Sequence, residues 1–277
     1  MQHRAELQAA LHTIRLRSPD PLAMARFYSR AYGMSLEPLE GGYACRGPQR
    51  QVQIVGGPAH QLGFAEFALH DDAAWQAFRE RARGLKTEAV PDVDGEAIGW
   101  RDPDGNLVVF SPPRQPGDAG LASSLPPATL QHFALRTPNL PDMLDFYTRQ
   151  VGLVLSDAVR DPEGQLRACF LRSDHLHHAL ALFFAPVACF DHQSFEAPDW
   201  AAMKTWGDHM AGLREPIVWG LGRHGPGNDV FFMVRDPDGN LAEISAEIEH
   251  CESDRPAGEW PHEERTLNLW GKAILRS

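Results

Sequence analysis

The spacing of apolar residues along the chain follows two recurring patterns, one typical of strands and one typical of helices. In the segment 130–137, polar and apolar faces alternate with a period of two, and His132 and Ala134 share one face, which predicts a strand. In the segment 141–150, apolar residues recur at helical spacing, and Gly152 follows as a residue typical of helix ends. The order strand, turn, helix is therefore predicted for this part of the chain.

The second half of the chain continues with the same kinds of element. The pattern predicts strands at 166–172, 179–184 and 192–196, a helix at 199–213, and a hairpin formed by 229–234 and 240–245. An Asp-Pro-Asp-Gly sequence, typical of a tight turn, joins the two strands of that hairpin. Such a series of strand-helix-strands units of about 50 to 60 residues predicts a mixed α+β fold.

The sequence also repeats itself. RDPDGNLVVFS at 101–111 returns as RDPDGNLAEIS at 235–245, and RSPDPLAMARFY at 17–28 aligns without a gap with RTPNLPDMLDFY at 136–147, at an offset of 136 − 17 = 119. The repeated segments keep their order in both halves, so we interpret the chain as a duplicated domain.

A segment between the copies, SPPRQPGDAGLASSLPPAT, is rich in Pro, Gly and Ser and lacks periodicity, as a linker does. This predicts the following division of the chain: an N-terminal copy at 1–112, a linker at 113–128, a C-terminal copy at 129–246, and a C-terminal segment at 247–277 that is either a lid over the site or a surface tail.

Composition narrows the classes of function. The chain of 277 residues is 43% hydrophobic and carries a formal net charge of −11, which argues against nucleic acid and against an anionic membrane surface as partners. No stretch has the apolar length of a membrane span or a signal peptide, so we expect no membrane and a cytoplasmic protein. Four widely spaced cysteines without a CxxC motif indicate neither a zinc site nor a disulfide framework.

One long segment carries a resemblance to a known family. GRHGPGNDVFFMVRDPDGNLAEIS at 222–245 resembles the C-terminal signature of type I extradiol ring-cleavage dioxygenases, members of the vicinal oxygen chelate superfamily that also includes glyoxalase I and the bleomycin-resistance proteins. The resemblance extends over nearly the whole chain, including the duplication and the closing RTLNLWG. It implies four βαβββ modules paired into two open barrels, a metal in the second barrel and assembly as a homo-oligomer.

The resemblance implies three metal ligands. At the family's ligand positions the chain has His132, His192 and Glu243. A mononuclear Fe(II) site for oxygen chemistry uses two imidazoles and one carboxylate on one face, and Mn(II) accepts the same set. A single histidine in a strand is more often a hydrogen-bonded structural residue, but three coincident matches favour a metal site.

The N-terminal copy provides an internal control for this assignment. The repeated segments align His132 with Thr13, while the shorter shared patterns align His192 and Glu243 with the residues Phe64 and Val109. The first copy therefore lacks all three ligands, and the sequence predicts chemistry in the second copy alone.

Two further histidines lie at family positions. The resemblance implies that His178 is the acid-base catalyst near the bound oxygen, which suits an imidazole because its pKa lies near neutral pH. Strand alternation alone leaves His177 as an alternative, and a solvated histidine cluster as a third interpretation. The resemblance also implies that His224 hydrogen-bonds a substrate hydroxyl, from a Gly- and Pro-rich loop that we expect to lie close to the ligand and that includes Asn228.

The main departure from the family pattern is Met233. Ring-cleaving relatives usually carry a tyrosine there, whereas the tyrosines of this chain are Tyr28, Tyr32, Tyr43 and Tyr147. A thioether donates no hydrogen bond, so the substrate position that the phenol serves in the family is lined differently here.

The resemblance implies an Fe(II)-dependent extradiol dioxygenase that cleaves a catechol-type aromatic and inserts both atoms of O₂. Its partners would be a small aromatic diol and O₂. Two alternatives stay open at this point: a metal-dependent lyase or isomerase of the same superfamily, which uses the ion as a Lewis acid, and a small-molecule binding protein with little turnover.

Overall fold

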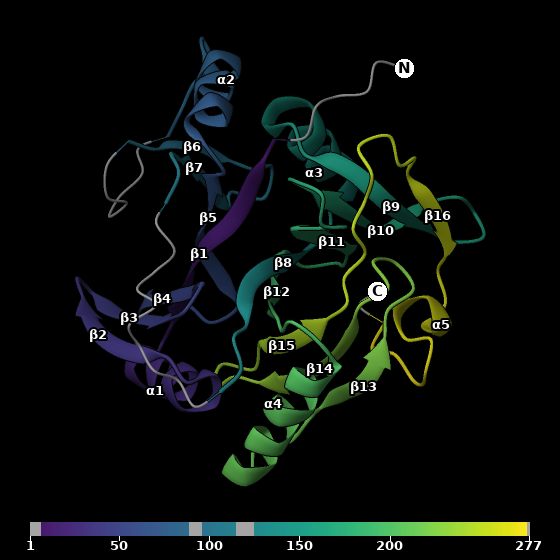
Figure 1. Cartoon of the computed structure of the whole chain (residues 1–277). Helices are drawn as coiled ribbons and strands as arrows, with labels where there is room; N and C mark the ends of the chain where they lie inside the picture. Colours follow the sequence, from purple (N-terminus) through teal and green to yellow (C-terminus); the bar gives the residue numbers. More distant parts are fainter. Residues whose placement is uncertain (1–6, 89–95, 115–124, 276–277) are drawn as a thin grey trace.

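Two open sheets, each built from one half of the chain, lie side by side in the protein (Figure 1). The computed structural model describes residues 7–88, 96–114 and 125–275. Most of the predicted linker 113–128 lies outside the described residues, as do both extreme ends of the chain. The α+β prediction is confirmed, and neither sheet closes on itself within the described residues.

The N-terminal sheet contains two modules. The first comprises β1 (Ala9–Ser18), α1 (Pro21–Tyr32), β2 (Ser35–Leu39), β3 (Gly42–Gly47) and β4 (Arg50–Gly56). The second comprises β5 (Gln61–Leu69), α2 (Asp72–Ala82), β6 (Ile98–Arg101) and β7 (Leu107–Ser111). Among the described residues of this module, Glu88 also forms an isolated bridge with Gly99 of β6.

The C-terminal sheet contains two complete βαβββ modules and one added strand. The third module comprises β8 (Thr129–Thr137), α3 (Leu140–Asp145), β9 (Val154–Arg160), β10 (Leu166–Arg172) and β11 (Leu180–Phe184). The fourth comprises β12 (Cys189–Glu196), α4 (Trp200–Leu213), β13 (Trp219–Arg223), β14 (Val230–Arg235) and β15 (Leu241–Ala246). After them come β16 (Gly258–Pro261) and the short helix α5 (Glu264–Leu267).

Strand order is the same in the two sheets. The N-terminal order β2-β3-β4-β1-β5-β7-β6 corresponds to β9-β10-β11-β8-β12-β15-β14, with β13 added at one edge and β16 at the other. Figure 1 shows β1 and β8 next to each other in the middle of the molecule and β16 on the outer side of β9. The duplication predicted from the repeated segments is thus visible as one strand order used twice.

Local sequence explains where the helices begin and end. Asp20 accepts a hydrogen bond from the backbone N–H of Ala23 at the start of α1, Pro21 occupies its first turn, and Gly33 ends it with a left-handed φ of 59°. The predicted helix 141–150 is α3 followed by a π-helical stretch, Phe146–Val151, and Gly152 ends it as expected.

The repeated Asp-Pro-Asp-Gly-Asn turns join the two copies reciprocally. Within each turn, the first aspartate, Asp102 or Asp236, accepts hydrogen bonds from backbone N–H groups of its own turn. Tyr147 of the second copy donates to Asp102 at 3.0 Å, and Tyr28 of the first copy donates to Asp236 at 3.3 Å. Because these tyrosines occupy equivalent positions of α1 and the α3 segment, each copy binds the turn of the other.

The hydrophobic core is continuous across the two copies. The ring of Tyr32 on α1 lies 4.9 Å from the ring of Phe195 on β12, and Phe67 on β5 lies 6.2 Å from Phe133 on β8. Buried apolar contact of this extent is the main stabilising contribution to such a fold, and it fixes β8 and β12 between the two halves.

Among the described residues, every helix is too short or too polar to span a bilayer. All four cysteines are free thiols, in line with the absence of a disulfide framework predicted above.

Candidate metal centre

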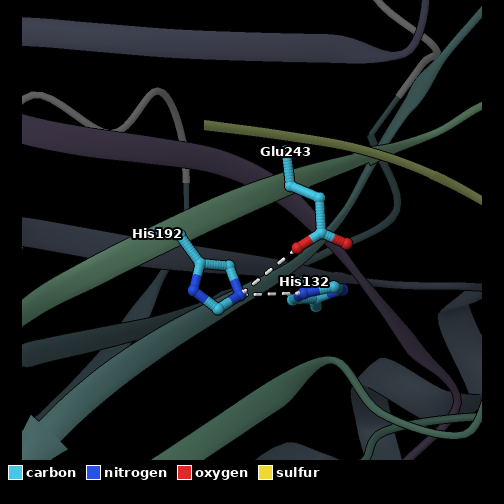
Figure 2. A group of neighbouring side chains, drawn as sticks. All are labelled: His132, His192 and Glu243. Atoms are coloured by element: carbon cyan, nitrogen blue, oxygen red, sulfur yellow. Dashed lines mark hydrogen bonds and ion pairs between the residues drawn. The ribbon is translucent and has the colours of Figure 1, made fainter. Parts of the chain in front are cut away.

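Three neighbouring strands bring His132, His192 and Glu243 together (Figure 2). On β12, Ser194 pairs with His132 of β8 on one side and with Glu243 of β15 on the other. His192 lies two residues before Ser194, and side chains two apart on a strand share a face. Register therefore accounts for the meeting of residues that are up to 111 positions apart (243 − 132).

The ligand atoms of the three residues converge on one point. Nε2 of His132 lies 3.3 Å from Nε2 of His192, which lies 3.8 Å from Oε2 of Glu243. All three side chains are buried, with exposed fractions of 2%, 4% and 0%. An ion about 2.1 Å from two nitrogens at a right angle separates them by about 3 Å, so the spacing fits a metal.

The other ring nitrogen of each histidine is already engaged. Nδ1 of His132 contacts the amide oxygen of Gln131, and Nδ1 of His192 lies 2.6 Å from Oδ1 of Asp191. Both acceptors require a proton on Nδ1, which leaves the lone pair of a neutral imidazole on Nε2. Metal-binding histidines are oriented in this way by outer partners, and the two Nε2 lone pairs face each other as in such a site.

Electrostatics favour the neutral form of the His132 imidazole. Burial lowers the pKa of His132 well below its usual value, and the nearby rings of His192 and His224 lower it further. Asp191 in turn is paired with Arg136, whose Nε lies 2.5 Å from Oδ2 of the carboxylate. A neutral imidazole is the form that binds a metal, so the surroundings favour the ligand state.

Sequence reasoning missed a second buried carboxylate beside the centre. Asp229, at 0% exposed, lies with His224 and Glu243 in a group whose ligand atoms are within 4.8 Å of one another. Burial, followed by the neighbouring charge of Glu196, raises the pKa of Asp229 well above its usual value. Only its place in the loop between a glycine-rich turn and β14 could have drawn attention to it.

The group that contains Asp229 is the poorer metal site of the two. Nδ1 of His224 lies 2.6 Å from the carbonyl oxygen of Leu267, and this group offers one imidazole and two carboxylates rather than two imidazoles and one carboxylate. Asp229 is not part of the cavity wall, whereas His132 and His192 are. An oxygen-activating centre needs open positions next to the ion, which favours the His132, His192 and Glu243 group.

A small cavity lies directly against the centre. It measures about 20 Å³, counted as the space open to the centre of a water-sized sphere, which is room for about one water molecule. The cavity wall is formed by His132, Phe170, His178, Ala181, Phe183, His192, Trp219, His224, Pro226, Met233 and Leu267. Its walls are mainly aromatic and aliphatic, and the polar groups on it are four imidazoles.

The structure places His177 and His178 differently with respect to the cavity. His178 lines the cavity, and its ring centre lies 4.3 Å from that of His132. His177 is fully buried behind it and is absent from the cavity wall. Strand alternation could not decide between them because β11 begins at Leu180, so both histidines lie in the preceding loop.

The loop that carries His224 borders the cavity, and its glycines pack against other segments of the protein. His224 lines the cavity and stacks on Phe231 with ring centres 3.8 Å apart. A Cβ on Gly225 would come within 2.8 Å of Trp260, and one on Gly227 within 3.0 Å of Nδ1 of His177. The glycines therefore allow close approach of these protein segments to the loop.

Asn228 and Met233 differ in how the structure places them. Asn228 is exposed, has a left-handed φ of 57° and is not on the cavity wall, so substrate contact by this residue stays a prediction without geometric support. Met233 is fully buried, pairs with Glu243 across β14 and β15, and lines the cavity. The position of the family tyrosine is thus occupied by an apolar side chain next to a candidate ligand.

Comparison with known proteins places this arrangement in a family. The profile of the Glyoxalase/Bleomycin resistance protein/Dioxygenase superfamily matches residues 129–244. Metapyrocatechase 2 from Cupriavidus necator is 32% identical in an alignment that covers 96% of this chain and 90% of that protein. The chain belongs to this superfamily. The family recognised from the 222–245 segment is therefore confirmed.

Solved structures of members of the superfamily share the fold. Homoprotocatechuate 2,3-dioxygenase from Brevibacterium fuscum, in complex with 3,4-dihydroxyphenylacetate, is similar with a TM-score of 0.79 and 22% identity, covering 99% of this chain and 92% of that one. The Mn(II)-bound glyoxalase from Novosphingobium aromaticivorans is similar with a TM-score of 0.76 and 22% identity, covering 96% and 92%. The predicted arrangement of βαβββ modules in open barrels is that of this superfamily.

Proposed function

We propose that this protein is an Fe(II)-dependent extradiol dioxygenase that cleaves a catechol-type aromatic with insertion of both atoms of O₂. The observation that carries the proposal is the convergence of two imidazole Nε2 atoms and one carboxylate, each imidazole oriented by an acceptor on its Nδ1. The relationship to a metapyrocatechase over nearly the whole chain supports the same activity. His132, His192 and Glu243 are the proposed ligands, and Mn(II) is the alternative ion.

We propose different roles for the ion and for the two histidines beside it. The ion, when bound, supplies adjacent positions at which a diol and O₂ meet. His178 lines the cavity beside His132 and is the proposed acid-base group for protons released or taken up by the diol oxygens. His224 is the proposed hydrogen-bonding partner of a substrate hydroxyl, because it lines the cavity and the contact of its Nδ1 with the carbonyl oxygen of Leu267 orients its ring.

The cavity wall indicates the class of catechol. Phe170, Phe183, Trp219 and Leu267 surround the space next to the ligands, and the described lining residues include no lysine or arginine. A carboxylate on the substrate ring would be buried here without a cation, which is unfavourable. We therefore propose an uncharged catechol, unsubstituted or with a small alkyl group, as the substrate.

Met233 favours one alternative function, that of a metal-dependent lyase or isomerase. Without a phenol at this position, the site has one fewer hydrogen-bond donor than ring-cleaving members of the family. A lyase or isomerase that uses the ion as a Lewis acid does not cleave the ring, so it does not need this donor. Turnover without O₂ separates this alternative from the dioxygenase.

Anaerobic reconstitution tests the proposal. The protein is loaded with Fe(II), mixed in air with catechol, 4-methylcatechol or 3,4-dihydroxyphenylacetate, and followed by O₂ uptake and by the yellow colour of ring-fission products. The proposal predicts one O₂ consumed per diol, with both uncharged catechols preferred over the carboxylate. If the protein binds iron but takes up no O₂ with any of these diols, the proposal is contradicted. If the protein converts a diol without O₂ when loaded with Mg²⁺ or Mn²⁺, the lyase or isomerase is supported.

Assembly as a homo-oligomer and a cytoplasmic location remain part of the proposal. Sedimentation of the purified protein across a range of concentrations measures the first. A mass equal to the 277-residue monomer at all concentrations would contradict it.

A further inference from the structure

The proposed acid-base residue His178 is the end of a buried chain of side chains that leads away from the cavity. Nδ1 of His178 lies 3.0 Å from Nδ1 of His177, and Nε2 of His177 lies 3.1 Å from Oδ2 of Asp157 on β9. The exposed fractions of the three side chains are at most 3%. Neither His177 nor Asp157 lines the cavity, so any effect of either residue on a bound substrate passes through His178.

Asp157 is held by the C-terminal segment. Its carboxylate accepts hydrogen bonds from Nε1 of Trp260 at 2.7 Å, from Nη2 of Arg255 at 3.0 Å and from the backbone N–H of Gly258 at 3.1 Å. Burial alone would raise the pKa of Asp157, but its contacts with His177, Trp260 and Arg255 lower it, which keeps the carboxylate ionised. The parallel pairing of β16 with β9 places these donors.

The contacts from Asp157 through His177 to His178 determine which ring nitrogen of His178 carries its hydrogen. In a neutral imidazole one nitrogen carries the hydrogen and the other carries the lone pair. Nε2 of His177 has no aligned hydrogen-bond partner among the described residues, so the carboxylate of Asp157 acts on it through its charge at 3.1 Å. This negative charge favours the hydrogen of His177 on Nε2, which leaves Nδ1 of His177 as an acceptor. The shared contact then requires the hydrogen of His178 on Nδ1, which leaves the lone pair of His178 on Nε2, the nitrogen that His177 does not engage.

Packing around the pair is close enough to hold both rings in place. A Cβ on Gly227 would lie 3.0 Å from Nδ1 of His177 and 3.3 Å from Cε1 of His178, so a larger residue would displace them. The backbone carbonyl of His178 is fixed by the amide of Gln131, which also contacts the ring of His132. The ring of His178 is therefore restrained from both sides.

We propose that Asp157 and His177 are positioning residues that set the tautomer and the ring orientation of His178, and that Trp260 and Arg255 connect this function to the C-terminal segment. The tail thus does more than cover the site, because it supplies the donors that hold Asp157. The inference rests on the proposed acid-base role of His178.

Replacement of Asp157 tests the inference on the Fe(II)-loaded protein. Asp157→Asn keeps the shape and removes the charge that selects the tautomer. We expect kcat for catechol to fall roughly 10- to 100-fold, the usual effect of losing an outer partner of an active-site histidine, with KM and iron content within about twofold of wild type. Unchanged kcat in a fully iron-loaded variant would overturn the inference.

A milder variant and a matched control accompany it. Trp260→Phe keeps an aromatic ring and removes one donor to Asp157, so kcat should fall by roughly 2- to 5-fold. Glu259→Gln makes the same carboxylate-to-amide change on the neighbouring, exposed residue of β16, whose partner is Arg160. The control should keep wild-type kinetics, and an equal loss in the control would show a general effect of disturbing β16.

A second measurement is independent of activity. Two-bond ¹⁵N correlation spectra of the protein loaded with diamagnetic Zn(II), with His177→Gln and His178→Gln used for assignment, report which nitrogen of each ring carries the hydrogen. We expect the Nδ1–H form of His178 in the wild type and a shift towards the Nε2–H form in Asp157→Asn. An Nε2–H form in the wild type, or no change in the variant, would refute the inference.

The two measurements separate the inference from the proposed function. If the wild type consumes no O₂ but Asp157→Asn shows the tautomer shift, the effect of Asp157 on His178 is supported and the dioxygenase proposal fails. If the wild type cleaves catechol and Asp157→Asn does so equally well, the dioxygenase stands and the positioning role fails.

Discussion

The two copies of the domain have the same strand register but different side chains at the positions of the candidate ligands. In the N-terminal copy, Glu66 on β5 pairs with Thr13 on β1 and with Val109 on β7. In the C-terminal copy, Ser194 on β12 pairs in the same way with His132 and Glu243. The positions of the candidate ligands therefore have structural equivalents in the first copy, and those equivalents are Thr13, Phe64 and Val109.

Apolar packing fills part of the corresponding space in the first copy. Phe64 and Val109 form a small buried cluster with Leu107. The guanidinium of Arg15 lies 4.6 Å from the centre of the Phe64 ring and donates to Gln53. A cation over an aromatic face is a stabilising contact, so this interior holds its own positive charge.

A charge network completes the interior of the first copy. Nη2 of Arg114 lies 2.8 Å from Oε1 of Glu66, and Nδ1 of His12 lies 3.7 Å from Oε2. Strand pairing and the turns are thus common to the two copies, while the side chains at the three candidate ligand positions differ. Each prediction below tests that separation.

The largest effect is expected for the matched pair His132→Ala and Thr13→Ala. The first removes a candidate ligand, and we expect more than about 100-fold weaker Fe(II) binding, since loss of even an outer partner costs up to that much. The second changes the equivalent residue of the other copy and should leave binding unchanged. Anaerobic Fe(II) titration measures both, and equal loss in the two variants would break the comparison.

The next effect is expected for Glu66→Gln. Burial alone would raise the pKa of Glu66, but its interactions with His12 and Ser111 and the charge of Arg114 lower it to about 2. A carboxylate with a lowered folded-state pKa stabilises the fold above its unfolded pKa, so the variant should lose about 3 kcal/mol of unfolding free energy at pH 7.

That difference has a defined pH dependence. It should shrink as the pH falls from about 4.5 to about 2, because the wild-type carboxylate then becomes protonated. Urea unfolding at several pH values measures it. A difference that does not change with pH would show that the ion pair contributes nothing beyond packing.

A smaller effect of opposite sign is expected for Asp229→Asn. Burial raises the pKa of Asp229, and the structure shows no hydrogen-bond partner for either carboxylate oxygen among the described residues. A neutral amide is less costly to bury, so the metal-free variant should melt a few degrees higher. Fe(II) binding should persist. Loss of stoichiometric iron would instead assign the metal to the group containing His224 and Asp229.

The smallest effects are expected for the tyrosines that join the copies. Tyr147→Phe removes one hydrogen bond to Asp102 and should cost about 1 kcal/mol. Tyr28→Phe should cost more, because the phenol oxygen also accepts a 2.7 Å hydrogen bond from Gln193, whose amide would be left without this acceptor. Urea unfolding of both variants gives the comparison, and the reverse order would contradict it.

Much of this fold could be predicted from local sequence. The alternation at 130–137 predicted β8, Asp199 and the apolar spacing predicted α4, and the repeated Asp-Pro-Asp-Gly turns predicted both hairpins. Strands β9, β13 and β16 were not predicted. β16 is a four-residue segment, too short to show an alternating pattern in the sequence, and it forms by pairing with β9.

The candidate site was predictable only in part. The family pattern located His132, His192, Glu243, His178 and His224 because their spacing around the turns is preserved. Asp229, Asp157 and the donors from the C-terminal segment were missed, since their relation to the centre is a matter of register and tail position that no local pattern encodes.

Anomalous scattering at the iron edge, from crystals grown anaerobically with Fe(II), tests the central claim most directly. The account predicts one strong peak per chain, bounded by Nε2 of His132, Nε2 of His192 and the carboxylate of Glu243, and none in the N-terminal copy. A peak between His224 and Asp229, or one near Thr13, Phe64 and Val109, would contradict it.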